Sequence, residues 1–293
     1  MNYRTLWQQL TLLYDAREAQ AVARLVLDTV CHLSFADICA GKDTQLPAEE
    51  QAQLAKIAQR LSLGEPVQYV LGEAWFCGRR FSVNSDVLIP RPETEEMCRL
   101  IVADRSVNSN AEVHESEQHG SSGCRVLDIG TGSGCLAVTL ALAWPAAVVE
   151  GWDISGAALS VAADNAALHR ADVLWRQADI LTAEPVAETW DMIVSNPPYI
   201  PARECREMER RVTDYEPSVA LFVPDDDPLR FYRAIGSYAL ASLVPDGVVW
   251  LETHYRHADA VQKLLLRQGF GRVSVLCDAF GKQRFVRAQR QDI

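Results

Sequence analysis

The residues best suited to chemistry form the loop Ser-Asn-Pro-Pro-Tyr at 195–199, directly after the apolar run Met-Ile-Val. Pro197 and Pro198 fix φ and remove two backbone N–H groups, and Asn196 is held near an extended conformation because a proline follows it. The loop therefore offers two acceptors, the Asn196 side-chain oxygen and the Pro197 carbonyl oxygen. Two acceptors suit the two N–H groups of a flat NH₂ group, on which Tyr199 can stack.

A glycine-rich loop, Val-Leu-Asp-Ile-Gly-Thr-Gly-Ser-Gly-Cys at 126–135, is the second candidate site. It runs from an apolar strand into a helix. Its glycines allow the backbone to turn sharply and approach a ligand, and the N–H groups at the helix start point to the same place. The residues of this loop predicted to bind a cofactor are Gly130, Thr131, Gly132, Ser133 and Gly134. A dinucleotide fingerprint would have Gly or Ala where Cys135 stands, so the spacing resembles instead the first motif of Rossmann-like methyltransferases; a purely structural glycine turn is the alternative.

Acidic residues follow the next two predicted strands. Asp153 ends the strand Val-Val-Glu-Gly-Trp-Asp, where a carboxylate can accept hydrogen bonds from both hydroxyls of a ribose. The alternative is that Asp153 caps the helix that begins near Ser155. After the third strand, Asp179 can accept from an adenine amino group and Ile180 can cover the ring, although an ordinary strand end explains this pair equally well.

A sulfonium cofactor in the glycine loop and a flat NH₂ group in the proline loop would together permit methyl transfer to nitrogen. An amide or aromatic amino nitrogen is a weak nucleophile because its lone pair is delocalised, so its alignment with the methyl–sulfur bond carries much of the rate. Charge is neutralised as the methyl group moves, which a water-poor pocket favours. No strong base is needed during the attack, because the proton can leave afterwards. The alternative for the proline loop is a rigid turn that ends a strand.

These loops need a sheet to bring them together, and from Arg125 onward strand patterns alternate with helix patterns. The predicted strands are Val126–Ile129, Val148–Trp152, Val173–Arg176, Met192–Ser195, Val248–Leu251, Val273–Leu276 and Arg284–Val286. The predicted helices between them include Leu136–Ala143, Ala157–His169, Phe231–Leu243 and Ala258–Gln268. Such alternation predicts an α/β fold with a doubly wound, mostly parallel sheet, in which ligands bind at the carboxyl ends of the strands.

The chain before this sheet divides into two further parts. Residues 1–73 show helical spacing of apolar residues and predict a small helical bundle. One predicted apolar face comprises Leu54, Ile57, Ala58 and Leu61. Residues 74–90 predict a hairpin linker, in which Phe76 and Phe81 flank a Gly-Arg-Arg turn. Residues 91–293 form the predicted catalytic domain, with a helix at Thr94–Ala103 and a flexible polar loop from Asp104 to Gly123.

The composition favours a cytoplasmic protein without a membrane span. No apolar run approaches the roughly 20 residues that a span needs, and acids and glutamines interrupt the N-terminal sequence where a signal peptide would be apolar. The net charge of −11 gives no electrostatic footprint for nucleic acid, so no direct nucleic-acid partner is expected. Eight scattered cysteines indicate small apolar side chains rather than disulfides. His254 and His257 lack an evident third ligand, so a pair of surface histidines is preferred to a metal site.

Nearly the whole chain resembles the release-factor glutamine methyltransferases, a family of protein-(glutamine) methyltransferases. The matching stretches are GEPVQYVLGEAWFCGRRFSVNSDVLIPRPETEEM, VLDIGTGSGCLAVTLAL, DISGAALSVAADNA, IVSNPPYIP and YEPSVAL. The glycine loop and Asn-Pro-Pro-Tyr are shared with other amino methyltransferases. The segment VLIPRPETE, placed before the glycine loop, is much more specific to this family.

The resemblance implies an S-adenosyl-L-methionine-dependent enzyme with a seven-stranded Rossmann-like domain and an N-terminal helical domain that recognises the substrate protein. It implies that the glycine loop, Asp153, the position of Ile180 and Asn196 contact the cofactor. It further implies that Asn196–Tyr199 hold the glutamine of a Gly-Gly-Gln tripeptide in a peptide-chain release factor. Segment Arg91–Glu95 is expected near the cofactor, without an assigned role.

Other interpretations stay open. The same loop would suit a glutamine on a large-subunit ribosomal protein, which the sequence separates poorly from a release factor. It would also suit the amino group of adenine in DNA or RNA, although the acidic balance of the chain counts against this. A non-catalytic adaptor that regulates translation termination is the third alternative, and the intact motifs argue against it. One departure from the family is His254, where a glycine is usual, and it leaves the geometry of that loop open.

Overall fold

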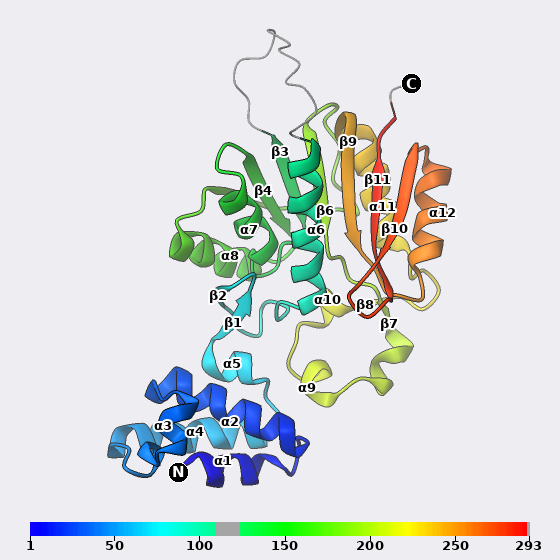
Figure 1. The fold of residues 1–293 in the computed structure, drawn as a ribbon. Coiled ribbons are helices and arrows are strands. Elements are labelled where there is room, and N and C mark those ends of the chain that lie inside the picture. Colours follow the sequence, from blue (N-terminus) through cyan, green and yellow to red (C-terminus); the bar gives the residue numbers. More distant parts are fainter. Residues whose placement is uncertain (109–123, 292–293) are drawn as a thin grey trace. The chain divides into compact units, whose positions relative to one another are not determined.

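A computed structural model of the chain describes residues 1–108 and 124–291, which divide into two compact units (Figure 1). The first unit comprises Met1–Glu73 together with Met208–Tyr215, and the second comprises Ala74–Glu207 with Glu216–Ile293. The first unit is therefore formed from two separate stretches of the sequence.

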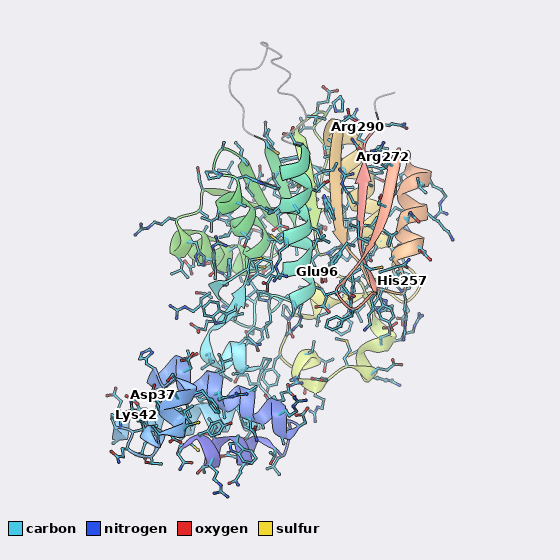
Figure 2. The ribbon with its side chains drawn as sticks, in the orientation of Figure 1. Asp37, Lys42, Glu96, His257, Arg272 and Arg290 are labelled. Atoms are coloured by element: carbon cyan, nitrogen blue, oxygen red, sulfur yellow. The ribbon has the colours of Figure 1, made fainter. Side chains whose placement is uncertain are left out.

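The first unit is helical, as predicted for residues 1–73. Its elements are α1 (Tyr3–Leu10), α2 (Ala16–Cys31), α3 (Phe35–Cys39), the 3₁₀ turn η1 (Lys42–Thr44), α4 (Ala48–Ser62), α5 (Val67–Leu71) and α9 (Arg210–Thr213). The predicted apolar face of α4 is buried in the core of this unit. Helix ends are fixed by side chains: Asp15 accepts hydrogen bonds from two backbone N–H groups at the start of α2, and Asp37 in α3 pairs with Lys42 at 2.5 Å (Figure 2).

The stretch 208–215 is held in the first unit by specific contacts. Arg211 forms an ion pair with Glu18 at 2.5 Å, and its guanidinium carbon lies 5.1 Å from the centre of the Tyr14 ring. The Tyr215 hydroxyl donates to the Leu63 carbonyl at 2.9 Å. No sequence pattern predicted that this stretch belongs to the helical unit.

The second unit is built on a seven-stranded sheet, which confirms the predicted α/β fold class. Its strands are β3 (Arg125–Ile129), β4 (Val148–Asp153), β5 (Val173–Gln177), β6 (Trp190–Ser195), β9 (Leu243–Glu252), β10 (Arg272–Cys277) and β11 (Gln283–Gln289). Their order is β10-β11-β9-β6-β3-β4-β5. The pairs from β5 to β9 are parallel, and β11 runs antiparallel to both of its neighbours. All seven predicted strands are present, and each is longer than predicted.

Helices cover both faces of this sheet. Successive side chains of a strand point to opposite faces, so a strand whose residues are all apolar needs a helical layer on each face. In β6, Met192 and Val194 pack into one core and Ile193 into the other. The first core contains residues of α6 (Pro92–Asn108), α7 (Cys135–Ala143) and α8 (Gly156–His169); the second contains residues of α11 (Arg230–Ser242) and α12 (Ala258–Gln268) (Figure 1). The strands are therefore rigid supports for the loops at their carboxyl ends.

Shorter elements complete the second unit. They are the hairpin β1 (Glu73–Phe76) and β2 (Arg79–Ser82), the parallel pair β7 (Ile200–Pro201) and β8 (Phe222–Val223), η2 (Ala202–Glu207) and α10 (Ser218–Leu221). The hairpin was predicted, but its turn lies at Cys77 and Gly78, which both have left-handed φ (48° and 74°). This pattern is typical of a two-residue hairpin turn. The predicted Gly-Arg-Arg turn was wrong, since Arg79 and Arg80 belong to β2.

Two further findings concern the predicted polar loop and membrane spans. Helix α6 continues to Asn108, so the prediction of a loop from Asp104 was wrong for its first residues. The remaining part of that prediction, 109–123, lies outside the described residues. Within 1–108 and 124–291, no helix is both long enough and apolar enough to cross a membrane.

Candidate active site

A cavity of about 330 Å³ opens where β3, β4, β5 and β6 reach their carboxyl ends. Of the predicted site residues, it is lined by Gly130, Gly132, Asp153, Asp179, Ile180, Asn196, Pro197 and Pro198. Loops from four strands therefore meet at one place, as expected for a doubly wound sheet.

The glycine loop forms one wall of this cavity. Gly130, Gly132 and Gly134 all have left-handed φ (73°, 54° and 76°), which other residues adopt only with strain. At Gly130 and Gly132 a Cβ atom would meet nothing within 4 Å, so both positions face open space. Gly134 differs, because a Cβ there would lie 2.9 Å from the Cβ of Ala162 in α8. Gly134 lines neither cavity of this site, and it allows α8 to pack closely.

Thr131 and Ser133 line a smaller adjoining cavity of about 50 Å³. This space also touches Arg91 and Thr94 of the segment 91–95. Below it the buried Asp128 accepts a hydrogen bond from the Thr131 hydroxyl at 2.6 Å, and burial raises the pKa of Asp128 to about 7. Asp128 therefore shapes the loop from beneath.

Asp153 lines the cavity, whereas the alternative considered from the sequence, that it caps α8, was wrong. One carboxylate oxygen accepts from the Gly132 N–H and the other from the Ser155 N–H, each at 2.9 Å. Burial raises the pKa of Asp153. Each oxygen of a carboxylate has two lone pairs, so Asp153 can accept hydrogen bonds beyond these two. Ser155, rather than Asp153, caps α8 through its own side chain.

Asp179 and Ile180 lie on the side of the cavity formed by the end of β5. The Asp179 side chain accepts from the Leu181 N–H at 2.9 Å, which fixes its orientation. Ile180 is half-buried against the core that also contains Trp152, and all three side chains line the cavity. This wall is apolar with one carboxylate, which is the chemistry that an adenine ring and its amino group require.

The proline loop forms the opposite side of the cavity. Its base is fixed because the buried Ser195 hydroxyl donates to the Ile129 carbonyl at 2.6 Å, joining β6 to β3. Asn196 is only partly buried, and its amide nitrogen donates to the Thr94 hydroxyl at 2.9 Å. Its amide oxygen has no partner among the hydrogen bonds within the described parts of the chain. That oxygen is therefore available as an acceptor.

Tyr199 is placed differently from Asn196, Pro197 and Pro198. Of the four predicted substrate-binding residues, it is the one that does not line the cavity. Its hydroxyl donates to the buried carboxylate of Glu252 at 3.2 Å, and its ring packs against the core that α11 and α12 cover. Burial raises the pKa of Tyr199. The structure thus assigns Tyr199 a hydrogen-bonding role that the sequence did not indicate.

Several wall residues were missed from the sequence. They include Val87 and Leu88 before α6, Pro217, Val219, Ala220 and Phe222 around α10, and Phe231 and Ile235 in α11. Two of these segments are joined by the buried Glu216, which accepts from Arg91 at 2.6 Å and from the Ile89 N–H at 3.2 Å. The pairing of VLIPRPETE with YEPSVAL was the available signal, since it places an arginine in one motif and a glutamate in the other.

These features fit an adenosine-containing sulfonium cofactor. Gly130 and Gly132 leave space against the backbone, Asp153 has free acceptor sites for hydroxyl groups, and Ile180 with Trp152 supplies apolar cover. Asn196 lines the same cavity. The arrangement can hold a cofactor and a flat NH₂ group side by side.

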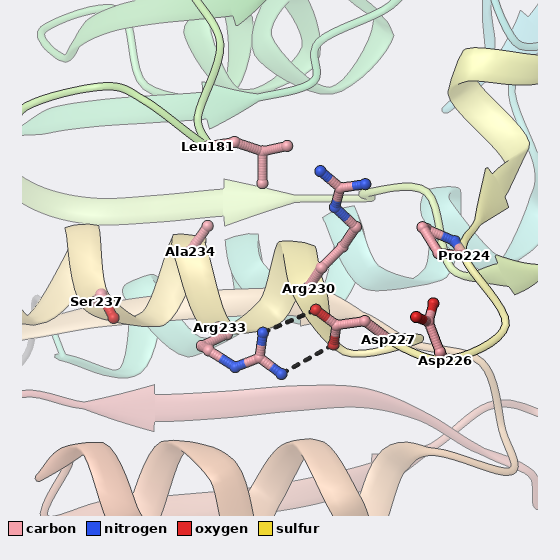
Figure 3. A pocket seen from close by; sticks show the side chains of 8 residues that line it. All are labelled: Leu181, Pro224, Asp226, Asp227, Arg230, Arg233, Ala234 and Ser237. Atoms are coloured by element: carbon pink, nitrogen blue, oxygen red, sulfur yellow. Dashed lines mark hydrogen bonds and ion pairs between the residues drawn. The ribbon is translucent and has the colours of Figure 1, made fainter.

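A second hollow, of about 410 Å³, lies beside the main cavity and is open to solvent. Figure 3 shows its lining, in which Arg233 of α11 forms two hydrogen bonds to Asp227, each of 2.9 Å. This ion pair occupies both groups. Leu181 and Arg230 line both spaces.

Of the two histidines considered as metal ligands, His254 lies near Tyr199, with their ring centres 6.1 Å apart, and His257 lies next to His254. His254 is only 8% exposed, so the prediction of a surface residue was wrong for it. Its ring stacks on Tyr255 at 4.8 Å, and burial lowers the pKa of His254. Its φ is not left-handed, so a glycine is not required at this position. No group of three metal-ligating side chains occurs among residues 1–108 and 124–291.

Comparison with known proteins gives matches along the whole chain. Residues 6–72 match the PrmC N-terminal domain, and residues 112–212 match the methyltransferase small domain. A release factor glutamine methyltransferase of Bacteroides thetaiotaomicron is 41% identical over 284 residues, which cover 97% of each chain. That of Flavobacterium psychrophilum is 34% identical over 98% of this chain and 97% of its own. A solved release-factor-specific protein-(glutamine-N5) methyltransferase of Alicyclobacillus acidocaldarius is 31% identical over 72% of this chain and 100% of its own, with a TM-score of 0.40.

Proposed function

Because this chain belongs to the release factor glutamine methyltransferase family, we propose that it methylates the side-chain amide nitrogen of the glutamine in the Gly-Gly-Gln tripeptide of a peptide-chain release factor. Its cofactor is S-adenosyl-L-methionine, which supplies an electrophilic methyl group on a positively charged sulfur when bound. The cytoplasm, where release factors act, is its proposed location.

The observation that carries this proposal is that Asn196, Pro197 and Pro198 line the same cavity as Gly132 and Asp153. Donor and acceptor groups of the reaction would thereby share one enclosed space. Residues of the glycine loop, Asp153, Asp179 and Ile180 would hold the cofactor.

The protein's part in the reaction is to hold and orient the amide. The Asn196 side-chain oxygen and the Pro197 carbonyl oxygen would accept the two N–H groups of the glutamine. These two bonds would hold the amide plane so that the nitrogen lone pair, which is perpendicular to that plane, points to the methyl group. The bound cofactor would supply the methyl group, and the amide nitrogen would lose one proton to water after the transfer. Because the attacking nitrogen needs no base, this positioning of the amide would account for most of the acceleration of methyl transfer. The apolar wall around Ile180 and Phe231 limits water in the cavity.

The decisive experiment is transfer of a labelled methyl group to an intact release factor and to the same factor with its tripeptide glutamine changed to alanine. We expect label in the first and none in the second. Equal labelling of both would contradict the proposal. Purified large-subunit ribosomal proteins and adenine-containing DNA and RNA serve as alternative substrates, and labelling of one of these without labelling of the release factor would replace it.

A further inference from the structure

We propose that Thr94 and Glu252 are positioning residues for the substrate amide, because they fix which atom of the Asn196 side chain faces the substrate. This inference rests on the proposed function and extends it to two residues that do not touch the reacting atoms. The Thr94 hydroxyl donates to one carboxylate oxygen of Glu252 at 2.6 Å, and accepts from the Asn196 amide nitrogen at 2.9 Å. The other oxygen of Glu252 accepts from Tyr199 at 3.2 Å.

The direction of these bonds follows from the donors and acceptors present. An ionised carboxylate only accepts hydrogen bonds, so Thr94 must give its single proton to Glu252. The lone pairs of Thr94 are then left to accept, and the NH₂ end of Asn196 is the end that can donate to them. The amide oxygen of Asn196 is thereby turned the other way, which is the orientation needed to accept from a glutamine N–H.

Burial makes this chain of bonds specific. Thr94 is 5% exposed and Glu252 is 1% exposed, so water does not offer alternative partners. Buried polar groups are expensive to leave without a hydrogen bond, and a reversed Asn196 amide would place its oxygen against a hydroxyl that has no proton left to give. The network also joins three elements that are distant in the sequence: α6, the proline loop and the end of β9.

The charge of Glu252 decides whether the network is directional. The pKa of Glu252 is raised to about 7: burial is the main cause and the charge of Glu93 adds to it, while the bonds from Thr94 and Tyr199 and the charge of Arg284 oppose the rise. Tyr232, on the α11 side, donates to the Glu252 backbone carbonyl rather than to the carboxylate. When Glu252 is protonated it can donate to Thr94, which frees the Thr94 proton for Asn196 and removes the preference for one amide orientation. Turnover should therefore fall as the pH drops through about 7.

The test compares Thr94→Val, Thr94→Ser and Glu252→Gln with a matched control, Thr139→Val. Thr139 has the same burial as Thr94, 6% against 5%, but its hydroxyl donates only to the Cys135 carbonyl within α7. We expect Thr94→Val and Glu252→Gln to lower kcat by about 10- to 100-fold, as misplacement of a reacting group does, with cofactor Kd within about twofold. Thr94→Ser should restore most of the turnover, and Thr139→Val should stay close to wild type. Glu252→Gln should also abolish the loss of kcat below pH 7.

A second measurement does not depend on turnover. The side-chain NH₂ resonances of Asn196, followed by NMR in the full-length protein with bound cofactor, should titrate with a midpoint near pH 7 in wild type and not in Glu252→Gln. If these resonances do not respond to pH, or if Thr94→Val turns over as fast as Thr139→Val, the positioning role is refuted while the proposed function stands. If the resonances titrate but the wild-type protein labels no release factor, the proposed function fails and the network remains.

Discussion

The role of Asp153 can be tested by its replacement with alanine, and the structure sets the size of the expected effect. Its two carboxylate oxygens each already accept one backbone N–H, from Gly132 and Ser155 at 2.9 Å. Two acceptor sites remain, so Asp153 can bind at most both hydroxyls of a ribose. A hydrogen bond to a charged group contributes about 1.5 kcal/mol or more, and two of them give about 3 kcal/mol. Since each 1.4 kcal/mol is tenfold in affinity, Kd for the cofactor should rise by about 150-fold.

Calorimetric titration of the cofactor at pH 8 measures this change, because alkaline pH favours the ionised form of a carboxyl whose pKa is raised by burial. At saturating cofactor, kcat should fall by less than about tenfold, because Asp153 holds no reacting atom. Asp191→Ala is the matched control, since Asp191 also accepts a backbone N–H, that of Arg125 at 2.7 Å, at the opposite end of the sheet. A Kd for Asp153→Ala within about threefold of the control would refute the assignment.

Three other predictions follow from the geometry. Asn196→Ala should lower kcat by about 10²- to 10³-fold, as loss of a preorganised polar group does, with a much smaller change in cofactor Kd; near-native methyl transfer would contradict it. Gly134→Ala should lower the free energy of unfolding, measured in urea, by about 2–4 kcal/mol, because the residue has a left-handed φ and its new Cβ would overlap with α8. Gly130→Ala should lower it by about 1–2 kcal/mol, because a Cβ at this position has open space and only the left-handed φ is unfavourable. Equal losses for the two variants would exclude the packing role of Gly134. Burial raises the pKa values of Asp128 and Glu252 to about 7, so the folded protein binds more protons than the unfolded chain between about pH 4 and 7, and the free energy of unfolding should fall as pH rises through this range. Asp128→Asn should flatten this slope in urea titrations at several pH values, and an unchanged slope would count against the assigned pKa.

Much of the fold was predictable because the relevant signals are local. Period-two and helical patterns of apolar residues mark each strand and helix, as in β6, where Ile193 and its neighbours are buried on opposite faces. The predicted strand ends were short because the residues beyond them, such as Trp190, pair in the sheet without breaking the apolar pattern. The hairpin turn was misplaced because Cys77 adopts a left-handed conformation that is uncommon outside glycine.

The site was predictable where one loop carries its own chemistry, and not where distant residues cooperate. Asn196 and Asp153 follow strands whose ends meet, so their proximity could be inferred. The bond from Thr94 to Glu252 joins positions that no local pattern connects. Tyr199 also donates to Glu252. The sequence alone could not distinguish this hydrogen bond from the predicted stacking of Tyr199 on the substrate.

The discontinuous first unit has a consequence for constructing hybrids with relatives. An exchange of residues 1–73 alone would transfer a bundle without the stretch that supplies Arg211 to Glu18 and Tyr14. The incoming helices would then have to pack against residues 208–215 of the other parent. Poor packing between them would lower expression of the hybrid rather than alter its specificity. A compatible hybrid must take both stretches, 1–73 and 208–215, from the same parent. The helical unit can therefore be exchanged only by replacing two separate segments of the gene.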